Sequence, residues 1–156
     1  MSLFARFIYS ALVWNERQRA RREGGTSLSK GSGEQAAHLI TGERGETLAY
    51  WYLRRAGYII VARNRRARSR AGELDLVGWD GPVLAFVEVK TRTTLEGGPP
   101  EAAVSRAQQR RIAKAAKDYL RKLRRGRVDY RFDIASIVWD AESGYQVRLI
   151  KDAFKG

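Results

Sequence analysis

The sequence predicts an α/β domain in which helices cover a central mixed sheet of about five strands. Two segments of helical pattern, at 34–56 and 101–124, are separated and followed by short apolar segments of strand length. The resulting order is helix, three strands, helix, two strands, which is typical of a sheet packed between helices. The chain has 156 residues and no cysteine, which excludes disulfides, thiolate metal sites and cysteine nucleophiles.

The first part of the chain differs in composition from the rest. Residues 3–23 have the apolar spacing of a helix followed by a charged second half, and residues 24–33 are rich in Gly and Ser, as linkers are. We therefore expect 1–33 to be an N-terminal helical extension with its linker, and 34–156 to be the main domain. The extension could dock on the main domain, pair with a second copy or touch a membrane surface. Docking or disorder is the simpler explanation.

The elements of the main domain follow from periodicity and from turn residues. The first helix ends at Gly57, a residue that commonly terminates helices. The Asp80-Gly81 pair is a hairpin signal, with Pro82 just after it. The expected elements are a helix at 34–56, strands at 58–62, 72–79 and 83–91, a basic loop at 63–70, a Gly/Pro loop at 95–100, a helix at 101–124 and strands at 130–139 and 145–151.

The charge of the chain points to a polyanionic partner. Thirty Lys and Arg against 17 Asp and Glu give a net charge of +13, which suits nucleic acid or an acidic membrane surface. Arginine predominates and makes bidentate phosphate contacts, so nucleic acid is favoured over a basic surface kept for solubility. No apolar run reaches the roughly 20 residues of a membrane span. We expect a cytoplasmic protein without stable membrane insertion.

Two charged side chains interrupt an otherwise apolar strand at 83–91. Glu88 and Lys90 are two residues apart and therefore lie on one face. Buried charges are costly unless they are paired or bind a metal. On this strand alone, a structural ion pair and a catalytic pair are about equally well supported.

A third charge on the preceding strand favours a catalytic site. If the Asp80-Gly81 turn pairs position 79 with position 82, Asp75 lies opposite position 86 and diagonally across from Glu88. Leu74 and Leu76 then share the other face of that strand. Two facing carboxylates repel unless a cation lies between them. With oxygen ligands alone, including the Val89 carbonyl, the expected ion is Mg²⁺, with Mn²⁺ as a substitute.

Two further residues are candidates with weaker support. Glu46 lies on a helix face with Gly42 and Gly45, whose small size would let the helix approach the sheet. From spacing alone an ordinary solvent-exposed glutamate is favoured. Gln108 interrupts the buried stripe of the second helix and either faces the site or is a satisfied core amide. His38 is expected to be a surface or capping residue.

Basic residues form two clusters that could follow a nucleic-acid backbone. One is the 63–70 segment, with five arginines and no acid. The other is the solvent face of the second helix, for which a simple solvated surface is the alternative. The candidate nucleic-acid-binding residues are Arg63, Arg65, Arg66, Arg68, Arg70, Arg92, Arg106, Arg110 and Lys114, with Lys117 and Arg121 on the same helix face.

Five short motifs in order resemble one family. They are Gly45-Glu46-Thr47-Leu48-Ala49, Asn64 with Arg66, Gly72-Glu73-Leu74-Asp75-Leu76, Phe86-Val87-Glu88-Val89-Lys90-Thr91-Arg92 and Arg131-Phe132-Asp133. Over roughly 38–151 the chain resembles the YraN family of small bacterial proteins. This resemblance implies the restriction-endonuclease-like fold of the PD-(D/E)XK nuclease superfamily, similar to Holliday-junction resolvases.

The resemblance also implies a set of site residues, namely Glu46, Asp75, Glu88, Lys90 and Gln108. Leu74 departs from the superfamily pattern, which has proline at this position. Gln108 stands where many family members carry lysine, so its role stays open.

Two functions are therefore expected as alternatives. The first is a Mg²⁺-dependent endonuclease that hydrolyses phosphodiester bonds in DNA, including branched or damaged DNA in repair or recombination. The second is a catalytically weak nucleic-acid-binding module that acts through a partner. Junction resolution would require two active sites and hence a homodimer, although no residue in the sequence indicates one.

Overall fold

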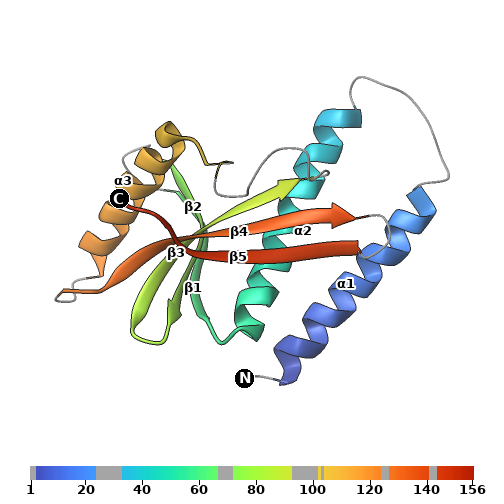
Figure 1. Cartoon of the computed structure of the whole chain (residues 1–156), viewed down its shortest axis with the longest axis horizontal. Coiled ribbons are helices and arrows are strands. Elements are labelled where there is room, and N and C mark those ends of the chain that lie inside the picture. The colour runs from blue at the N-terminus through green and yellow to red at the C-terminus, as the bar shows by residue number, and fades with distance from the viewer. Residues whose placement is uncertain are drawn as a thin grey trace.

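The computed structural model describes residues 3–23, 33–66, 72–92, 102, 104–123, 127–140 and 144–156. Its elements are α1 (Leu3–Glu23), α2 (Gly33–Arg55), β1 (Ile59–Arg66), β2 (Glu73–Asp80), β3 (Val83–Arg92), α3 (Arg106–Lys122), β4 (Tyr130–Asp140) and β5 (Gly144–Phe154). The five strands form one sheet in the order β1-β2-β3-β4-β5 (Figure 1). Neighbouring strands are antiparallel except β3 and β4, which are parallel. The expected α/β fold with a mixed sheet is confirmed.

The two faces of the sheet bury separate hydrophobic cores. Side chains alternate along β3, so Phe86 faces α3 while Ala85 and Val87 face α2. The α3 side is built around stacked aromatic rings, with 4.9 Å between the ring centroids of Phe132 and Phe154. The α2 side packs Leu53 and other aliphatic residues. Burial of each large side chain contributes roughly 1.5–3 kcal/mol to folding.

The β2–β3 hairpin differs in register from the sequence prediction. Asp80 pairs with Val83, so Gly81 and Pro82 form the turn, and Gly81 has a positive φ of 58°. Proline has no N–H for a ladder hydrogen bond, which favours its place in the turn rather than in the strand. The prediction that position 79 pairs with 82 is therefore wrong. In the observed register Asp75 comes across from Glu88 instead of from position 86.

Strand β1 continues through residues that were predicted to be a loop. Arg63 pairs with Leu76 and Arg65 with Leu74, so 63–66 belong to the sheet, while 67–70 lie outside the described residues. Between these two pairs Asn64 has a positive φ of 46°. Leu74 packs in the α3-side core and Leu76 in the α2-side core. The two leucines do not share one face as predicted, because alternation is interrupted at Asp75.

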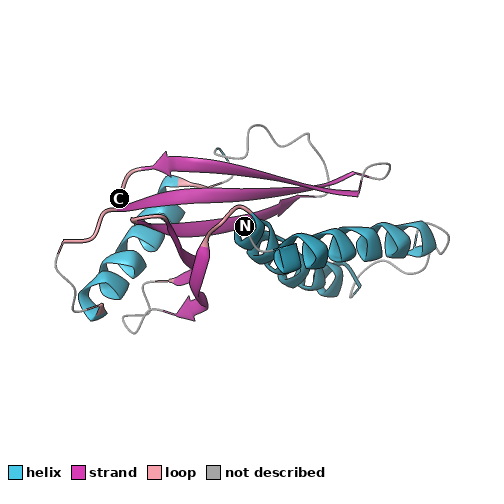
Figure 2. Ribbon diagram, turned by 90° about the horizontal axis from the view of Figure 1, so that it is seen from below, coloured by secondary structure: helices cyan, strands magenta, loops and turns pink. Residues whose placement is uncertain are grey.

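The helices agree with the prediction apart from their boundaries. Helix α3 begins at Arg106 rather than 101, because the Ser105 hydroxyl accepts the Gln108 N–H at 3.2 Å and caps the helix. Helix α1 runs beside α2 (Figure 2), with ring centroids of Tyr9 and Tyr52 5.9 Å apart. The extension is thus docked on the main domain. Residues 24–32 and the predicted 95–100 loop lie outside the described residues.

Candidate functional site

Asp75 lies where β2 and β3 stop pairing. The last pair of the ladder is Leu76 with Val87, and the next β3 amide in reach, that of Val89, donates to Asp75 Oδ2 at 2.8 Å. A side-chain carboxylate thus replaces a backbone acceptor between the strands. Asn64, at the facing position of β1, has a positive φ of 46°, and the alternation of side chains along β2 is interrupted at Asp75.

Glu88 and Lys90 lie together on the α3 face of β3, as predicted. Glu88 is only 6% exposed. Its Oε1 is 2.8 Å from Lys90 Nζ and accepts a 2.6 Å hydrogen bond from Gln108 Nε2. A buried carboxylate needs such donors, because its charge would otherwise be desolvated without compensation. Gln108, for which two roles were open, therefore reaches into this cluster from α3.

Among the described side chains of this cluster, negative charge is in excess. The pKa of Asp75 is raised to about 7, chiefly by burial and then by the charge of Glu88, with a smaller contribution from Glu46. The Val89 N–H and Lys90 act in the opposite direction but do not offset the rise. A second positive charge would stabilise the ionised form of this carboxyl.

Helix α2 brings Glu46 within electrostatic range of Asp75, because Gly45 lets the helix approach β3. A Cβ atom added at Gly45 would lie 1.9 Å from Thr91 Oγ1, so a larger residue does not fit there without a shift. An added Cβ at Gly42 would meet nothing within 4 Å. The close approach therefore depends on Gly45, and the predicted role of Gly42 in it is wrong.

The donors of this cluster suit a hard divalent cation, since they are carboxylate oxygens whose repulsion a cation would relieve. Within the described residues, however, no three Asp, Glu or His side chains are gathered closely enough to form a ready-made metal centre. Asp75 and Glu88 form the pair that converges, and Glu46 acts on it from α2. The ligand set Asp75, Glu88, Glu46 and the Val89 carbonyl stays a prediction.

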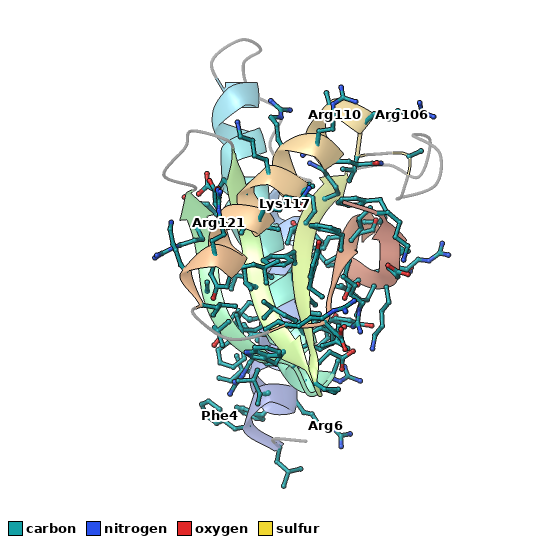
Figure 3. The ribbon with its side chains drawn as sticks, turned by 90° about the vertical axis from the view of Figure 1, so that its left-hand side faces the viewer. Phe4, Arg6, Arg106, Arg110, Lys117 and Arg121 are labelled. Carbon is teal, nitrogen blue, oxygen red and sulfur yellow. The ribbon has the colours of Figure 1, made fainter. Side chains whose placement is uncertain are left out.

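Basic side chains cover the outer face of α3. Figure 3 shows Arg106, Arg110, Lys117 and Arg121 along this helix, and Lys114 is exposed between them. Lys114, Lys117 and Arg121 line an open hollow of about 440 Å³ together with Leu120 and Asp118. These residues lie on the helix that carries Gln108, so a polyanion following the helix would pass beside the acidic cluster.

The β1 arginines are fixed on the two faces of the sheet. The Arg63 guanidinium lies 4.6 Å from the centroid of the Tyr50 ring on α2. Arg65 lies on the α3 side, where its charge lowers the pKa of Tyr119 against the larger rise caused by burial. The side chains of Arg66, Arg92 and His38, and all of Arg68 and Arg70, lie outside the described residues.

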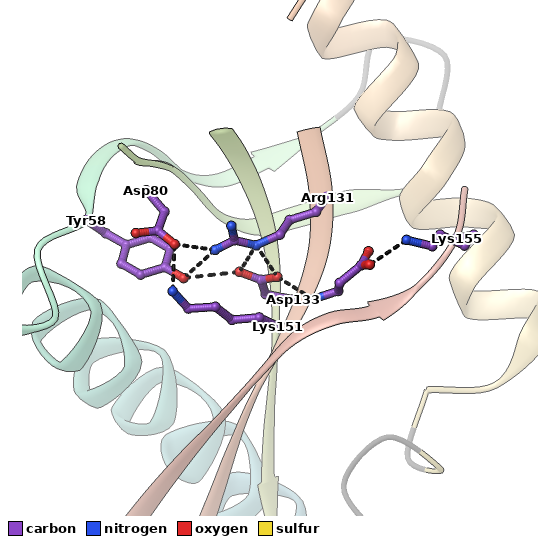
Figure 4. A network of polar contacts seen from close by, with 7 residues as sticks. Tyr58, Asp80, Arg131, Asp133, Lys151 and Lys155 are labelled. Atoms are coloured by element: carbon purple, nitrogen blue, oxygen red, sulfur yellow. Dashed lines mark hydrogen bonds and ion pairs between the residues drawn. The ribbon is translucent and has the colours of Figure 1, made fainter. Parts of the chain in front are cut away.

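Sequence reasoning missed a second polar cluster, which lies on the α2 face of the sheet (Figure 4). The fully buried Asp133 accepts hydrogen bonds from Arg131 Nε at 2.9 Å, Tyr58 Oη at 3.2 Å and the Asp152 N–H at 2.9 Å. Asp80 Oδ2 is 2.5 Å from Arg131 Nη2 and 2.7 Å from Lys151 Nζ. These two hydrogen bonds lower the pKa of Asp80, and burial together with Asp133 raises the pKa of Tyr58.

Only part of this second cluster could be recognised in the sequence. Arg131 and Asp133 belong to one of the quoted motifs, but no function was assigned to them. Tyr58 and Asp133 are 75 residues apart, and Arg131 and Asp80 are 51 apart. Helical or strand spacing carries no information at such separations.

Fold and site together define a small α/β protein with an acidic and lysine cluster at the opening between two strands. The chain belongs to the uncharacterised protein family UPF0102, whose model matches residues 45–137. It is 42% identical over 121 residues to a UPF0102 protein of Koribacter versatilis, covering 78% of this chain and 83% of that protein. A relative from Solibacter usitatus is 47% identical over 116 residues, covering 72% and 84%, and one from Geobacter metallireducens is 45% identical over 114, covering 73% and 91%.

Proposed function

We propose that this protein is a divalent-metal-dependent nuclease that hydrolyses phosphodiester bonds in DNA. The observation that carries the proposal is the convergence of Asp75 and Glu88 where β2 and β3 separate, with Lys90 bound to Glu88. Carboxylates with uncompensated charge beside a lysine are the groups that metal-assisted phosphodiester hydrolysis requires. The resemblance to the PD-(D/E)XK superfamily implies the same three residues as part of the site.

Each residue has a distinct role in this proposal. Asp75 and Glu88, with Glu46 and the Val89 carbonyl, would hold Mg²⁺ or Mn²⁺. When bound, the ion would supply positive charge that polarises the phosphate and acidifies a water molecule. The Lys90 ammonium would orient that water or stabilise the charge that builds on the phosphate. Gln108 positions Glu88 by its 2.6 Å hydrogen bond.

The charge of the chain supports a nucleic-acid substrate. A net charge of +13 attracts a phosphodiester polymer, and the exposed cations of α3 lie on the helix that supplies Gln108. We propose branched or damaged DNA as the preferred form, in keeping with the resolvase-like resemblance.

One observation favours the alternative, a nucleic-acid-binding module that acts through a partner. Glu88 Oε1 already has two donors, Lys90 and Gln108, as a purely structural ion pair would. On that alternative the basic surface binds nucleic acid and the acidic cluster only stabilises the sheet.

A cleavage assay separates these functions. We expect purified protein with Mg²⁺ or Mn²⁺ to cut linear, flapped or four-way-junction DNA, and Asp75→Asn to reduce cleavage at least about 100-fold because the ion loses a charged ligand. Asp152→Asn is the matched control, since Asp152 lies on the edge strand β5, pairs with the exposed Lys155, and asparagine tolerates its positive φ.

Either of two results would contradict the nuclease proposal. One is equal cleavage by the wild type and Asp75→Asn, which would place the activity elsewhere. The other is metal-independent DNA binding with a steep salt dependence and no cleavage of any substrate, which would establish the binding module.

A further inference from the structure

Helix α1 is apolar on two opposite sides. Its inner side packs on the domain through Ala5, which is buried, and through Tyr9 and Leu12. Its outer side exposes four large apolar residues: Leu3 is 81% exposed, Phe4 66%, Phe7 72% and Trp14 64%. Positions 3, 7 and 14 recur at one and two helical turns, so they form one stripe. Phe4 lies at its edge, where its ring also packs edge-on against Trp51 on α2, with the ring centroids 6.3 Å apart.

The helix cannot hide this outer stripe by turning. Tyr9 packs edge-on against Tyr52 on α2, and the Arg55 guanidinium lies 5.4 Å from the centroid of the Tyr9 ring. Rotation of α1 would bury the stripe only by exposing the residues that dock it. An exposed apolar patch with aromatic side chains, kept beside a well-packed interface, indicates a binding surface.

The charges in the sequence of α1 favour an anionic partner. The exposed Arg6 lies in the first turns of the helix (Figure 3), and the second half of α1 is predominantly basic in sequence. A second copy of the chain also has a net charge of +13, and repulsion between two such chains opposes self-association. An anionic surface would instead gain from both the arginines and the apolar side chains. The second-half charges are Arg17, Arg19, Arg21 and Arg22 against Glu16 and Glu23.

We infer that α1 binds the surface of an anionic phospholipid bilayer, with its outer stripe in the headgroup region and its axis in the plane of the membrane. Aromatic residues beside arginines are typical of helices that lie at this interface. Among the described helices, none has the length and apolarity to cross a membrane. Figure 1 places α1 and α3 on opposite sides of the molecule, so the basic face of α3 stays open to nucleic acid.

Vesicle sedimentation without nucleic acid tests this inference independently of the proposed nuclease. We expect the full chain to bind vesicles of phosphatidylcholine with about 30% phosphatidylglycerol, and to bind neutral phosphatidylcholine vesicles weakly. The double variant Phe7→Ser/Trp14→Ser keeps every charge and should bind anionic vesicles at least about tenfold more weakly. Tyr130→Ser removes an exposed aromatic residue at the start of β4, on the side away from α1, and should bind as the wild type does.

Each other outcome overturns the inference. Equal binding by the double variant would show that basic charge alone attracts the vesicles. No binding by the wild type would exclude this lipid surface. A dimer in sedimentation equilibrium that Phe7→Ser/Trp14→Ser dissociates, without vesicle binding, would assign the stripe to a second copy. Circular dichroism and thermal unfolding check that the variants fold, which is expected because both replaced side chains are exposed.

Discussion

The sheet carries two polar clusters that differ in how far their charges are balanced. On the α2 face, Arg131 and Lys151 match Asp80 and Asp133, and each of these carboxylates has at least two donors. Where β2 and β3 separate, Lys90 stands against Asp75 and Glu88, with Glu46 on α2 adding more negative charge. The pKa of Asp80 is lowered, whereas that of Asp75 is raised to about 7.

This difference indicates different roles for the two clusters. In the α2-face cluster, hydrogen bonds from Lys151 and Arg131 lower the pKa of Asp80, so its ionisation stabilises the fold. This cluster joins β2, β4, β5 and the residue before β1. Where repulsion is left over, ionisation destabilises the fold until a cation binds. The balanced cluster is therefore structural, and the unbalanced one is suited to a ligand. Three substitutions test this distinction.

The largest expected loss of stability comes from a substitution in the balanced cluster on the α2 face. Asp133→Ala would leave Arg131 with one carboxylate and the Asp152 N–H without an acceptor. Removing one partner of a buried ion pair costs about 3–5 kcal/mol. Urea unfolding at neutral pH measures this change. A loss below about 1 kcal/mol would show that the network contributes little.

The next effect concerns the packing that positions Glu46. Gly45→Ala would place a Cβ against Thr91 Oγ1 and should destabilise by about 1–3 kcal/mol through overpacking. On the proposed function, DNA cleavage should also fall, because α2 moves away from β3. Gly42→Ala is the matched control: it meets no atom within 4 Å and should stabilise the helix by about 0.5–1 kcal/mol. Identical effects of the two substitutions would contradict the close approach.

The third substitution is expected to raise the stability of the protein rather than lower it. The folded-state pKa of Asp75 is above its unfolded value, so its contribution to stability is fully present below about pH 4 and is lost as the pH rises towards 7. Without metal, Asp75→Asn should therefore stabilise the protein at pH 8, keep the acceptor for the Val89 N–H, and make little difference near pH 4.

Thermal unfolding across this pH range, with and without Mg²⁺, measures the difference. Mg²⁺ should stabilise the wild type and leave Asp75→Asn nearly unchanged, because only the wild type gains a cation between two carboxylates. If Asp75→Asn instead destabilises the protein at pH 8, neighbouring donors already stabilise the Asp75 carboxylate without metal, as they do for the carboxylates of the other cluster.

Local patterns were enough to predict the sheet, the helices and the face shared by Glu88 and Lys90, because alternation and helical spacing are properties of neighbouring residues. They were not enough to predict the β2–β3 register. Pro82 lies in the turn, so each β2 residue pairs with a β3 residue two positions later than predicted. The α3 start at Ser105 and the β1 extension through Asn64 were missed for a similar reason. Both depend on a cap or a backbone angle that periodicity does not encode.

Long-range contacts set the other limit. Spacing alone favoured an exposed Glu46, and the packing of Gly45 on Thr91 brings it towards Asp75. Two partners of Asp133, Tyr58 and Asp152, lie 75 and 19 residues away in the chain. Such contacts follow from the tertiary fold, and no local pattern in a single sequence identifies them.

The parallel pairing of β3 with β4 sets the two clusters back to back. Glu88 pairs with Ile134, and the adjacent Val87 pairs with Asp133, so carboxylates occupy neighbouring rows on opposite sides of one sheet. A slip of β4 by one residue would turn Asp133 into the aromatic layer and Ile134 towards Tyr58. The buried charge of Asp133 would therefore disfavour this misalignment of β4.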